Sequence, residues 1–165
     1  MPKNPWEKEW EVVREFRRSL SKAVTVVFTN GCYDLFHAGH VESLEFAKRA
    51  VANQYLTCLI VGVNDDAGVR RLKGSGRPIN DLMSRMQVLK ACRFVDICVP
   101  FSEDAPERLI RAVEPNIIVK DAWYRRRYVA GGDWVKKHGG KVMFAPTLKG
   151  VSTTEILKRG GSNGG

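Results

Sequence analysis

Two histidines three positions apart, His37 and His40, are the side chains of this chain best suited to phosphate chemistry. They follow an apolar, β-branched run at 24–28, which predicts a strand buried on both faces. Apolar residues at helical spacing follow His40 and predict a helix. The pair therefore lies at a strand-to-helix junction, where unpaired backbone N–H groups and the helix dipole favour an anion.

Gly39, between the two histidines, removes a side chain where the backbone must approach a ligand closely. Two imidazoles at this position would add hydrogen-bond donors that stay bonded to a phosphate as it reaches its transition state. The alternative is a pair of ordinary surface histidines that cap a helix. The strand before the pair and the helix after it favour the functional interpretation.

Residues 29–40 read Thr-Asn-Gly-Cys-Tyr-Asp-Leu-Phe-His-Ala-Gly-His. This segment resembles the T-x-G-x-F-D-x-x-H-x-G-H signature of the cytidylyltransferase-like nucleotidyltransferases, with Tyr33 in place of phenylalanine. Members transfer a nucleoside monophosphate from a triphosphate to a phosphorylated acceptor and release pyrophosphate. The resemblance implies a nucleotide-binding set that includes Thr29, Asn30, Gly31, Asp34 and Gly39 beside the histidines.

Mg²⁺ is expected to bridge the phosphates, as it does for most triphosphate substrates. Asp34 could orient a metal-bound water or a histidine, or it could cap the entry to the helix. Both interpretations of Asp34 stay open at this point, and no cluster of carboxylates predicts a dedicated two-metal site.

The composition is that of an ordinary soluble protein, with 44% hydrophobic and 27% charged residues in 165. We see neither a secretory signal nor an apolar run of membrane-spanning length, and therefore expect no membrane partner. Cys32, Cys58, Cys92 and Cys98 form no C-x-x-C pair, which predicts reduced thiols in a cytoplasmic protein.

The formal net charge of +9 implies anionic partners. Nucleic acid is one candidate, but the charge is spread along the chain and no nucleic-acid-binding motif accompanies it. A nucleoside triphosphate with a phosphorylated small-molecule acceptor explains the same excess. Composition alone does not separate these two.

Strand and helix patterns alternate along the chain. Strands are expected at 24–28, 55–63, 95–99, 117–119 and 141–145, and helices at 5–20, 64–72, 81–89, 102–113, 133–137 and after residue 152. This order predicts an α/β fold, a single Rossmann-like doubly wound domain with a mostly parallel five-stranded sheet. We expect an amphipathic helix within 1–22, a nucleotidyltransferase domain at 23–159 and a flexible tail at 160–165.

The N-terminal helix places Trp6, Trp10, Val13, Phe16 and Leu20 on one face. An exposed stripe with two tryptophans would promote aggregation. The stripe is therefore expected to dock on the domain or on a partner subunit, as in a homodimer.

A second glycine-rich segment, Lys-Gly-Ser-Gly-Arg-Pro at 73–78, is basic but is not a P-loop. With the segments at 63–66, 85–89 and 152–156, it resembles one branch of the family in order and spacing. That branch is the D-glycero-β-D-manno-heptose 1-phosphate adenylyltransferases, which make ADP-heptose for bacterial lipopolysaccharide. The resemblance implies ATP as the nucleotide and a sugar 1-phosphate as the acceptor.

Residue roles follow from this second resemblance. It implies a catalytic Lys73 with His37 and His40, and nucleotide contacts from Asn64, Ser152, Thr153 and Thr154. A capping box from Ser152 to Glu155 independently predicts a helix N-terminus there. Arg85 would support the loop or a phosphate, with a helix-surface ion pair as the alternative.

One segment departs from that branch. After the fourth strand the branch shows Lys-Gly-Gly-Asp-Tyr, whereas this chain reads Lys120-Asp-Ala-Trp-Tyr124 and then three arginines. Lys120, Trp123 and Tyr124 are expected at the substrate. A different, more anionic acceptor and a re-routed loop with solvated charges both explain the change.

Two other functions stay open. One is a cytidylyltransferase that uses CTP with glycerol 3-phosphate or another alcohol phosphate. The other is a non-catalytic binding protein that keeps the fold and uses its basic surface, for example to bind nucleic acid. The intact histidines, Asp34, Lys73 and the Ser-Thr-Thr stretch argue against loss of the site.

Overall fold

The computed structural model describes residues 4–148 and 150–161. In chain order the elements are α1 (Glu7–Ser19), β1 (Thr25–Gly31), α2 (Ala38–Lys48), the 3-10 turn η1 (Gln54–Leu56), β2 (Thr57–Asn64), α3 (Asp66–Lys73), α4 (Leu82–Ala91), β3 (Ile97–Phe101), α5 (Glu107–Val113), β4 (Ile117–Asp121), the 3-10 turn η2 (Ala122–Tyr124), α6 (Gly132–Lys137), β5 (Lys141–Ala145) and α7 (Thr153–Gly161).

The five strands form one sheet in the order β3-β2-β1-β4-β5, and every described pair is parallel. The expected α/β, Rossmann-like architecture is confirmed. Strand β1 lies at the centre, with Phe28 opposite Ile60 of β2 and Ile118 of β4. The chain winds outward from β1 in both directions, so a topological switch point lies between β1 and β4.

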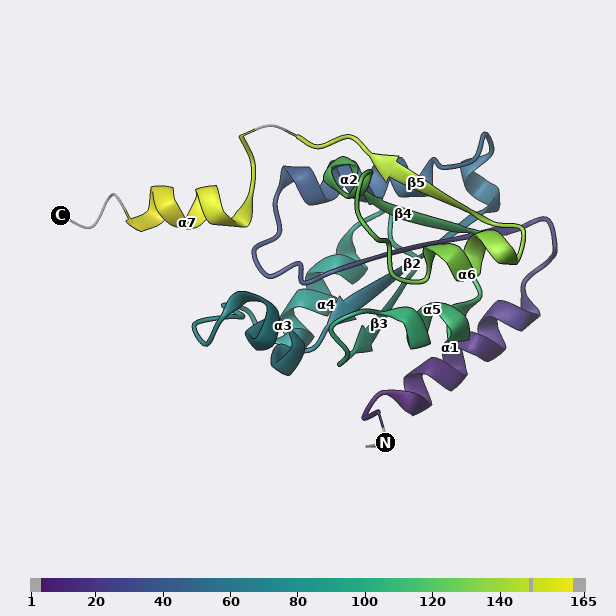
Figure 1. The fold of residues 1–165 in the computed structure, drawn as a ribbon, viewed down its shortest axis with the longest axis horizontal. Coiled ribbons are helices and arrows are strands. Elements are labelled where there is room, and N and C mark those ends of the chain that lie inside the picture. Colours follow the sequence, from purple (N-terminus) through teal and green to yellow (C-terminus); the bar gives the residue numbers. More distant parts are fainter. Residues whose placement is uncertain (1–3, 149, 162–165) are drawn as a thin grey trace.

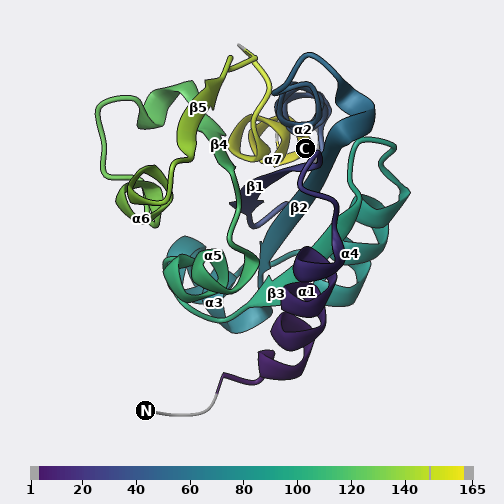
Figure 2. The same ribbon diagram turned by 90° about the vertical axis from the view of Figure 1, so that its right-hand side faces the viewer.

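Helices cover both faces of the sheet (Figures 1 and 2). Alternating residues of β1 point to opposite faces: Val26 and Phe28 pack with α1, α5 and α6, whereas Val27 packs with α2 and α4. Each strand therefore buries both of its faces, which is why the strands read as continuous apolar runs. Helix α7 extends away from the sheet in Figure 1.

The N-terminal helix α1 docks on its own chain. Trp10 is only 2% exposed, and its indole Nε1 donates to the carbonyl of Pro100 at 2.9 Å. Val13 is buried beside it, while Phe16 lies at the edge of the contact. The tryptophan stripe thus docks on the domain, which is the first of the two roles that we expected for it.

Several boundaries differ from the sequence expectation. The second strand begins at Thr57, because residues 54–56 form a turn whose start is capped by the Asn53 side chain. The third strand lies two residues later than expected, at Ile97–Phe101. The segment after β4, which the sequence pattern did not place, forms η2.

The C-terminal helix α7 continues through Gly160 and Gly161, where we had expected the tail to begin. A cap at its first turn lets the helix tolerate glycines that each cost about 1 kcal/mol. The rest of the expected tail, 162–165, lies outside the described residues. Within the part of the chain that is described, no helix is both long and apolar enough to cross a membrane.

Candidate active site

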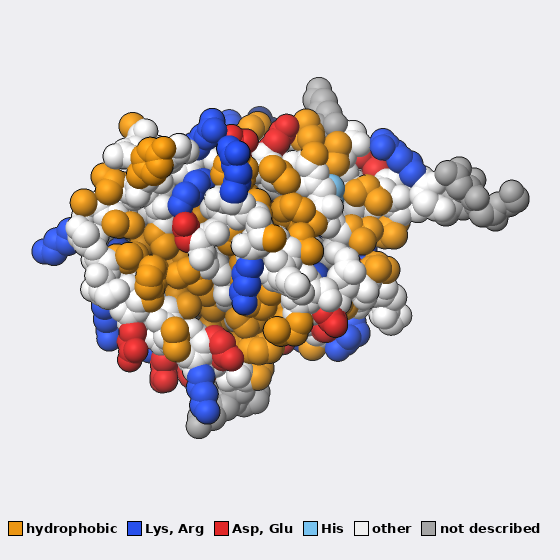
Figure 3. Space-filling model, turned by 180° about the vertical axis from the view of Figure 1, so that it is seen from behind, with side chains coloured by type: hydrophobic (Ala, Val, Ile, Leu, Met, Phe, Trp, Pro, Cys, Tyr) orange, Lys and Arg blue, Asp and Glu red, His pale blue; other side chains and the backbone are white. Residues whose placement is uncertain are grey.

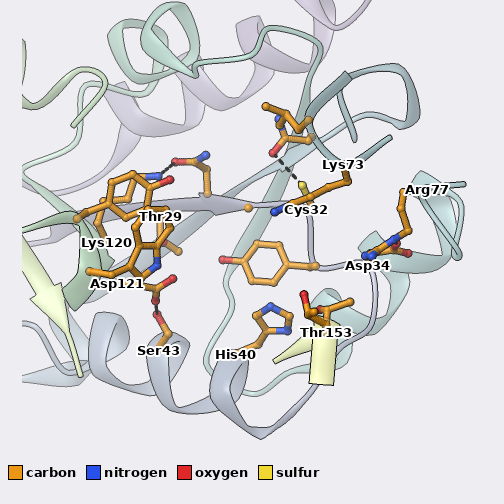
Figure 4. A pocket seen from close by; sticks show the side chains of 18 of the residues that line it. Thr29, Cys32, Asp34, His40, Ser43, Lys73, Arg77, Lys120, Asp121 and Thr153 are labelled. Atoms are coloured by element: carbon orange, nitrogen blue, oxygen red, sulfur yellow. Dashed lines mark hydrogen bonds and ion pairs between the residues drawn. The ribbon is translucent and has the colours of Figure 1, made fainter. Parts of the chain in front are cut away.

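A cavity of about 390 Å³ opens beyond the carboxyl ends of β1, β2 and β4, beside the switch point (Figure 4). It is lined by the end of β1 and the turn after it, the first turns of α2 and α7, the loop after α3, and the β4–η2 junction. The lining residues are Thr29–Asp34, His40, Ser43, Asn64, Leu72, Lys73, Arg77, Asp104, Lys120, Asp121, Trp123, Tyr124, Thr153 and Thr154.

His37 and His40 stack on each other at the start of α2. Their ring centroids lie 3.8 Å apart, and the His37 backbone N–H donates to Nδ1 of His40 at 3.4 Å. A Cβ on Gly39 would lie 3.1 Å from the His37 ring, so a side chain at this position would push that ring aside by a few tenths of an ångström. Only His40 lines the cavity, and His37 supports it from behind.

Burial, with a smaller contribution from His37, lowers the pKa of His40 to about 3. His40 is therefore neutral at physiological pH in the ligand-free protein. Burial also lowers the pKa of His37, and its Nδ1 has no hydrogen-bond partner among the described residues. Each neutral ring can donate one hydrogen bond and accept another.

Asp34 has a role that neither of our two interpretations included. Its buried carboxylate accepts from the backbone N–H groups of Ile79 and Asn80, each at 2.9 Å, and from Nε of Arg77 at 2.5 Å. Burial raises its pKa, but these hydrogen bonds outweigh that effect and the net shift is downward. Asp34 thus fixes the basic loop at 73–78 to the turn after β1, and both of its carboxylate oxygens already accept hydrogen bonds there.

This tether positions Lys73. Lys73 is the last residue of α3, which ends at Gly74 in the left-handed region, with φ at +100°. The loop then returns to Asp34 through Arg77, so Lys73 and Arg77 both line the same wall of the cavity.

Arg85 supports the loop after α3, which is one of the two roles that the resemblance implied, and it does not line the cavity. It is 1% exposed, and its Nη1 donates to the carbonyls of Cys32 and Asn64 at 2.6 and 2.7 Å. Its Nε donates to Asn80, and its Nη2 pairs with Asp66 at 2.7 Å. Arg85 therefore joins the ends of β1 and β2 to the loop beneath the cavity.

Asn64 closes the floor of the cavity at the end of β2. It is 3% exposed, and its Oδ1 lies 3.9 Å from the Cys32 thiol. Its Nδ2 finds no acceptor among the described residues, although it lines the cavity. A buried amide donor without a partner is costly, so this group suits an acceptor oxygen on a ligand.

Lys120 lies on the opposite wall from Lys73. Its ammonium donates to Oδ1 of Asn30 at 2.7 Å and lies 4.9 Å from the centre of the Tyr124 ring. Burial lowers its pKa to about 8, against the opposing effect of Asp121. An anionic ligand would restore the ordinary pKa of this group.

Beyond Lys120, Trp123 stands at the rim and is 51% exposed. Its ring lies 3.8 Å from that of Tyr124 and 4.8 Å from the Arg127 guanidinium. The two neighbours hold the indole in place at the mouth of the cavity. The departure from the Lys-Gly-Gly-Asp-Tyr pattern therefore forms part of the cavity wall.

Helix α7 brings its first turn to the cavity, with Thr153 and Thr154 among the lining residues. Ser152 lies just outside and accepts from the backbone N–H of Glu155 at 3.2 Å, as the first half of the expected capping box. Two helix N-termini, those of α2 and α7, thus meet at one site.

Most expected site residues converge on the cavity: Thr29, Asn30, Gly31, Asp34, His40, Asn64, Lys73, Lys120, Trp123, Tyr124, Thr153 and Thr154. His37, Gly39, Ser152 and Arg85 lie behind this lining. The lining residues that we did not anticipate are Cys32, Tyr33, Ser43, Leu72, Arg77, Asp104 and Asp121. Ser43 carries a signal that could have been used, because it lies three residues after His40 on the same helix face.

The chain was compared with known proteins. The model of the cytidylyltransferase-like family matches residues 28–159. A relative from Coxiella burnetii (strain Dugway 5J108-111), the Bifunctional protein HldE, is 54% identical over 135 residues, which are 82% of this chain and 27% of that protein. The protein of the same name from Halorhodospira halophila is 47% identical over 148 residues, covering 90% of this chain and 30% of the relative. This chain thus spans less than a third of these curated relatives.

Solved structures share the fold. A lipopolysaccharide core biosynthesis protein from Thermoplasma volcanium superposes with a TM-score of 0.57 at 24% identity, over 76% of this chain and 97% of that chain. A pantoate-beta-alanine ligase from Francisella tularensis gives 0.60 at 16% identity, over 90% and 73%. At these identities the likeness concerns the fold alone.

Proposed function

Because this chain belongs to the cytidylyltransferase-like family, we propose that it is an adenylyltransferase that transfers AMP from ATP to a sugar 1-phosphate. The proposed acceptor is heptose 1-phosphate, and the products are an ADP-sugar and pyrophosphate. The observation that carries the proposal is the convergence of His40, Lys73, Lys120 and the α7 N-terminus on one cavity. The relatives named Bifunctional protein HldE support it.

In the proposed reaction an oxygen of the acceptor phosphate attacks the α-phosphorus of ATP. The new P–O bond forms as the bond to the β-phosphate oxygen breaks, and pyrophosphate leaves with its electron pair. Such a transfer needs charge stabilisation and alignment more than a covalent intermediate. No proton has to be removed from the attacking oxygen, because a phosphate monoester is already ionised at neutral pH.

The cavity walls suit these two tasks. His40 would donate to the α-phosphoryl oxygens, where charge develops in the transition state. Lys73, Arg77 and the first turn of α7 would hold the phosphates of the nucleotide. The unpartnered Nδ2 of Asn64 would supply a further donor.

The described residues contain no group of three metal-ligating side chains, and Asp34 is occupied by Arg77. They therefore fit Mg²⁺ that arrives with the nucleotide and is held mainly by phosphate oxygens. When bound, the ion would neutralise phosphate charge and help to position the triphosphate.

The setting of this activity is part of the proposal. We place it in the cytoplasm, in the formation of ADP-heptose for lipopolysaccharide. The proposal concerns only the part of the relatives that this chain spans. Figure 3 shows lysines and arginines scattered among apolar side chains on one face, without a continuous basic stripe. That arrangement favours small anionic ligands over nucleic acid.

The test is pyrophosphate release with Mg²⁺, crossing ATP, CTP, GTP and UTP with heptose 1-phosphate, other sugar 1-phosphates and glycerol 3-phosphate. The proposal expects the largest kcat/KM with ATP and heptose 1-phosphate. Release only with CTP and glycerol 3-phosphate would make the chain a cytidylyltransferase. No release with any pair, together with salt-dependent RNA or DNA binding, would replace the enzyme with a binding protein.

A further inference from the structure

Asp121 is one of three carboxylates that line the cavity, and the other two, Asp34 and Asp104, pair with arginines. Asp121 ends β4 and lines the cavity beside Lys120. Among the described residues, none forms an ion pair with it. The neighbouring ammonium of Lys120 donates to Asn30 instead. Asp121 therefore keeps acceptor capacity for a ligand.

Its hydrogen-bond partner among the described residues is a hydroxyl from another element. Ser43 Oγ of α2 donates to Oδ1 of Asp121 at 3.3 Å, across 78 positions of the chain. Ser43 lies three residues after His40 on the same helix face, so both side chains reach the cavity. The serine oxygen still has lone pairs to accept a hydrogen bond, and Oδ2 of Asp121 has no described partner.

Figure 4 shows where this pair lies in the cavity. Asp121, Ser43 and Lys120 are on one side of His40, whereas Lys73 and Arg77 are on the other. A carboxylate repels phosphate, and the Lys120 ammonium already donates to Asn30, so the phosphates belong beside Lys73 and Arg77. The Asp121 side suits a neutral group that donates hydrogen bonds.

We propose that Asp121 and Ser43 form a hydroxyl-binding subsite that holds a vicinal diol of a substrate. One hydroxyl would donate to the free carboxylate oxygen, and its neighbour would bond to the Ser43–Asp121 pair. A divalent cation fits less well, because the described residues hold no group of three His, Cys, Asp or Glu side chains that could bind one. This inference rests on the proposed function, which puts two diol-bearing molecules in the cavity: the ribose of ATP and the sugar of the acceptor.

The experiment combines ligand hydroxyl deletions with protein variants. Calorimetry would give Kd for ATP, 2′-deoxy-ATP and 3′-deoxy-ATP, and pyrophosphate release would give kcat/KM for heptose 1-phosphate and its 2-deoxy analogue. The proteins are the wild type, Asp121→Asn and Ser43→Ala. Glu42→Gln, an exposed neighbour on the same helix, is the matched control for loss of one negative charge.

In the wild type, deleting the recognised hydroxyl should raise Kd for ATP or lower kcat/KM for the acceptor by about 10- to 100-fold, as for a hydrogen bond to a charged group. In Asp121→Asn and Ser43→Ala this penalty should shrink to about threefold or less, while Glu42→Gln keeps it. Loss of the penalty for the ATP analogues assigns the subsite to ribose. Loss of the penalty for the sugar analogue assigns it to the acceptor. Either result supports the proposal.

Three results would overturn it. If deleting the hydroxyl weakened binding or turnover in both variants as much as in the wild type, other groups would have to recognise the diol. A change only in the Mg²⁺ concentration needed for half-maximal rate would make Asp121 a metal ligand. A wild type that binds no nucleotide and releases no pyrophosphate would remove the proposed function and this subsite together. In the first two cases the wild type still transfers AMP, so the proposed function survives. Should Asp121→Asn fail to fold, Ser43→Ala decides the same question.

Discussion

The tether between Asp34 and the basic loop can be broken with one isosteric change, Asp34→Asn. The asparagine oxygen can still accept from Ile79 and Asn80, but its NH₂ group faces the Arg77 guanidinium and removes the ion pair. Breaking a buried pair by changing one partner costs about 3–5 kcal/mol. Because Arg77 is partly exposed, we expect a loss of about 3 kcal/mol in the free energy of unfolding at neutral pH.

The pH dependence of this loss follows from the lowered pKa of Asp34. A carboxyl whose pKa is lower in the folded state stabilises the protein above its unfolded pKa, near about 4. That stabilisation is lost as the pH falls through the folded pKa. The difference between wild type and Asp34→Asn should therefore be full at neutral pH and shrink in acid.

Urea unfolding from neutral to acidic pH measures this difference. Asp104→Asn is the control for stability, because Asp104 forms an exposed ion pair with Arg71 and its loss should cost about 0.5 kcal/mol or less. Equal stability of Asp34→Asn and wild type at neutral pH would refute the reasoning. So would a difference that grows as the pH falls.

The same variant tests whether Asp34 acts through Lys73. If the tether positions Lys73, Asp34→Asn should lower kcat about tenfold or more, and this effect should nearly disappear in a Lys73→Met background. Fully additive effects of the two changes would leave Asp34 with a stabilising role alone.

Three further predictions concern the cavity. His40→Ala should lower kcat by about 100-fold or more without unfolding the chain. The control is His138→Ala, which changes an exposed histidine that stacks on Trp134 and should leave kcat unchanged. Near-normal turnover of His40→Ala would remove His40 from the mechanism. Lys120→Met should stabilise the ligand-free protein by about 2 kcal/mol at neutral pH, because burial penalises the charged ammonium below its folded pKa of about 8. In urea unfolding, this gain should shrink as the pH rises from the folded pKa of Lys120 towards the ordinary pKa of lysine. A variant that is less stable than the wild type at every pH would contradict the prediction. Trp123→Gly should change kcat/KM for acceptors more than for nucleotides, and equal effects on both would place this rim residue outside the acceptor site.

The parts of the structure that the sequence predicts well depend on local patterns. The apolar run before His37 and the apolar spacing after His40 specify the β1–α2 junction within a few residues. The five strands were expected because each is an apolar run between turn signals. Asp81, expected to start a helix, caps α4 through the backbone N–H of Ser84 at 2.8 Å.

The parts that sequence reasoning missed depend on contacts between distant segments. Arg85 was expected to support the loop or a phosphate, but its deep burial was not expected, since arginines are usually exposed. Its burial follows from carbonyl groups at the ends of β1 and β2, which meet only once the sheet has formed. The Ser43–Asp121 contact likewise joins α2 to β4, and no local sequence pattern predicts it. The role of Asp34 depends on where the loop after α3 returns.

The most direct test of the central claim is the product itself. Phosphorus NMR would follow ATP, heptose 1-phosphate and Mg²⁺ with the wild type, and with His40→Ala as the inactive control. The account predicts a pair of mutually coupled resonances of a new phosphoanhydride between AMP and the sugar phosphate, together with pyrophosphate in equal amount. Release of ADP and inorganic phosphate, with the sugar phosphate unchanged, would contradict it, because the cavity would then hydrolyse ATP and not transfer AMP.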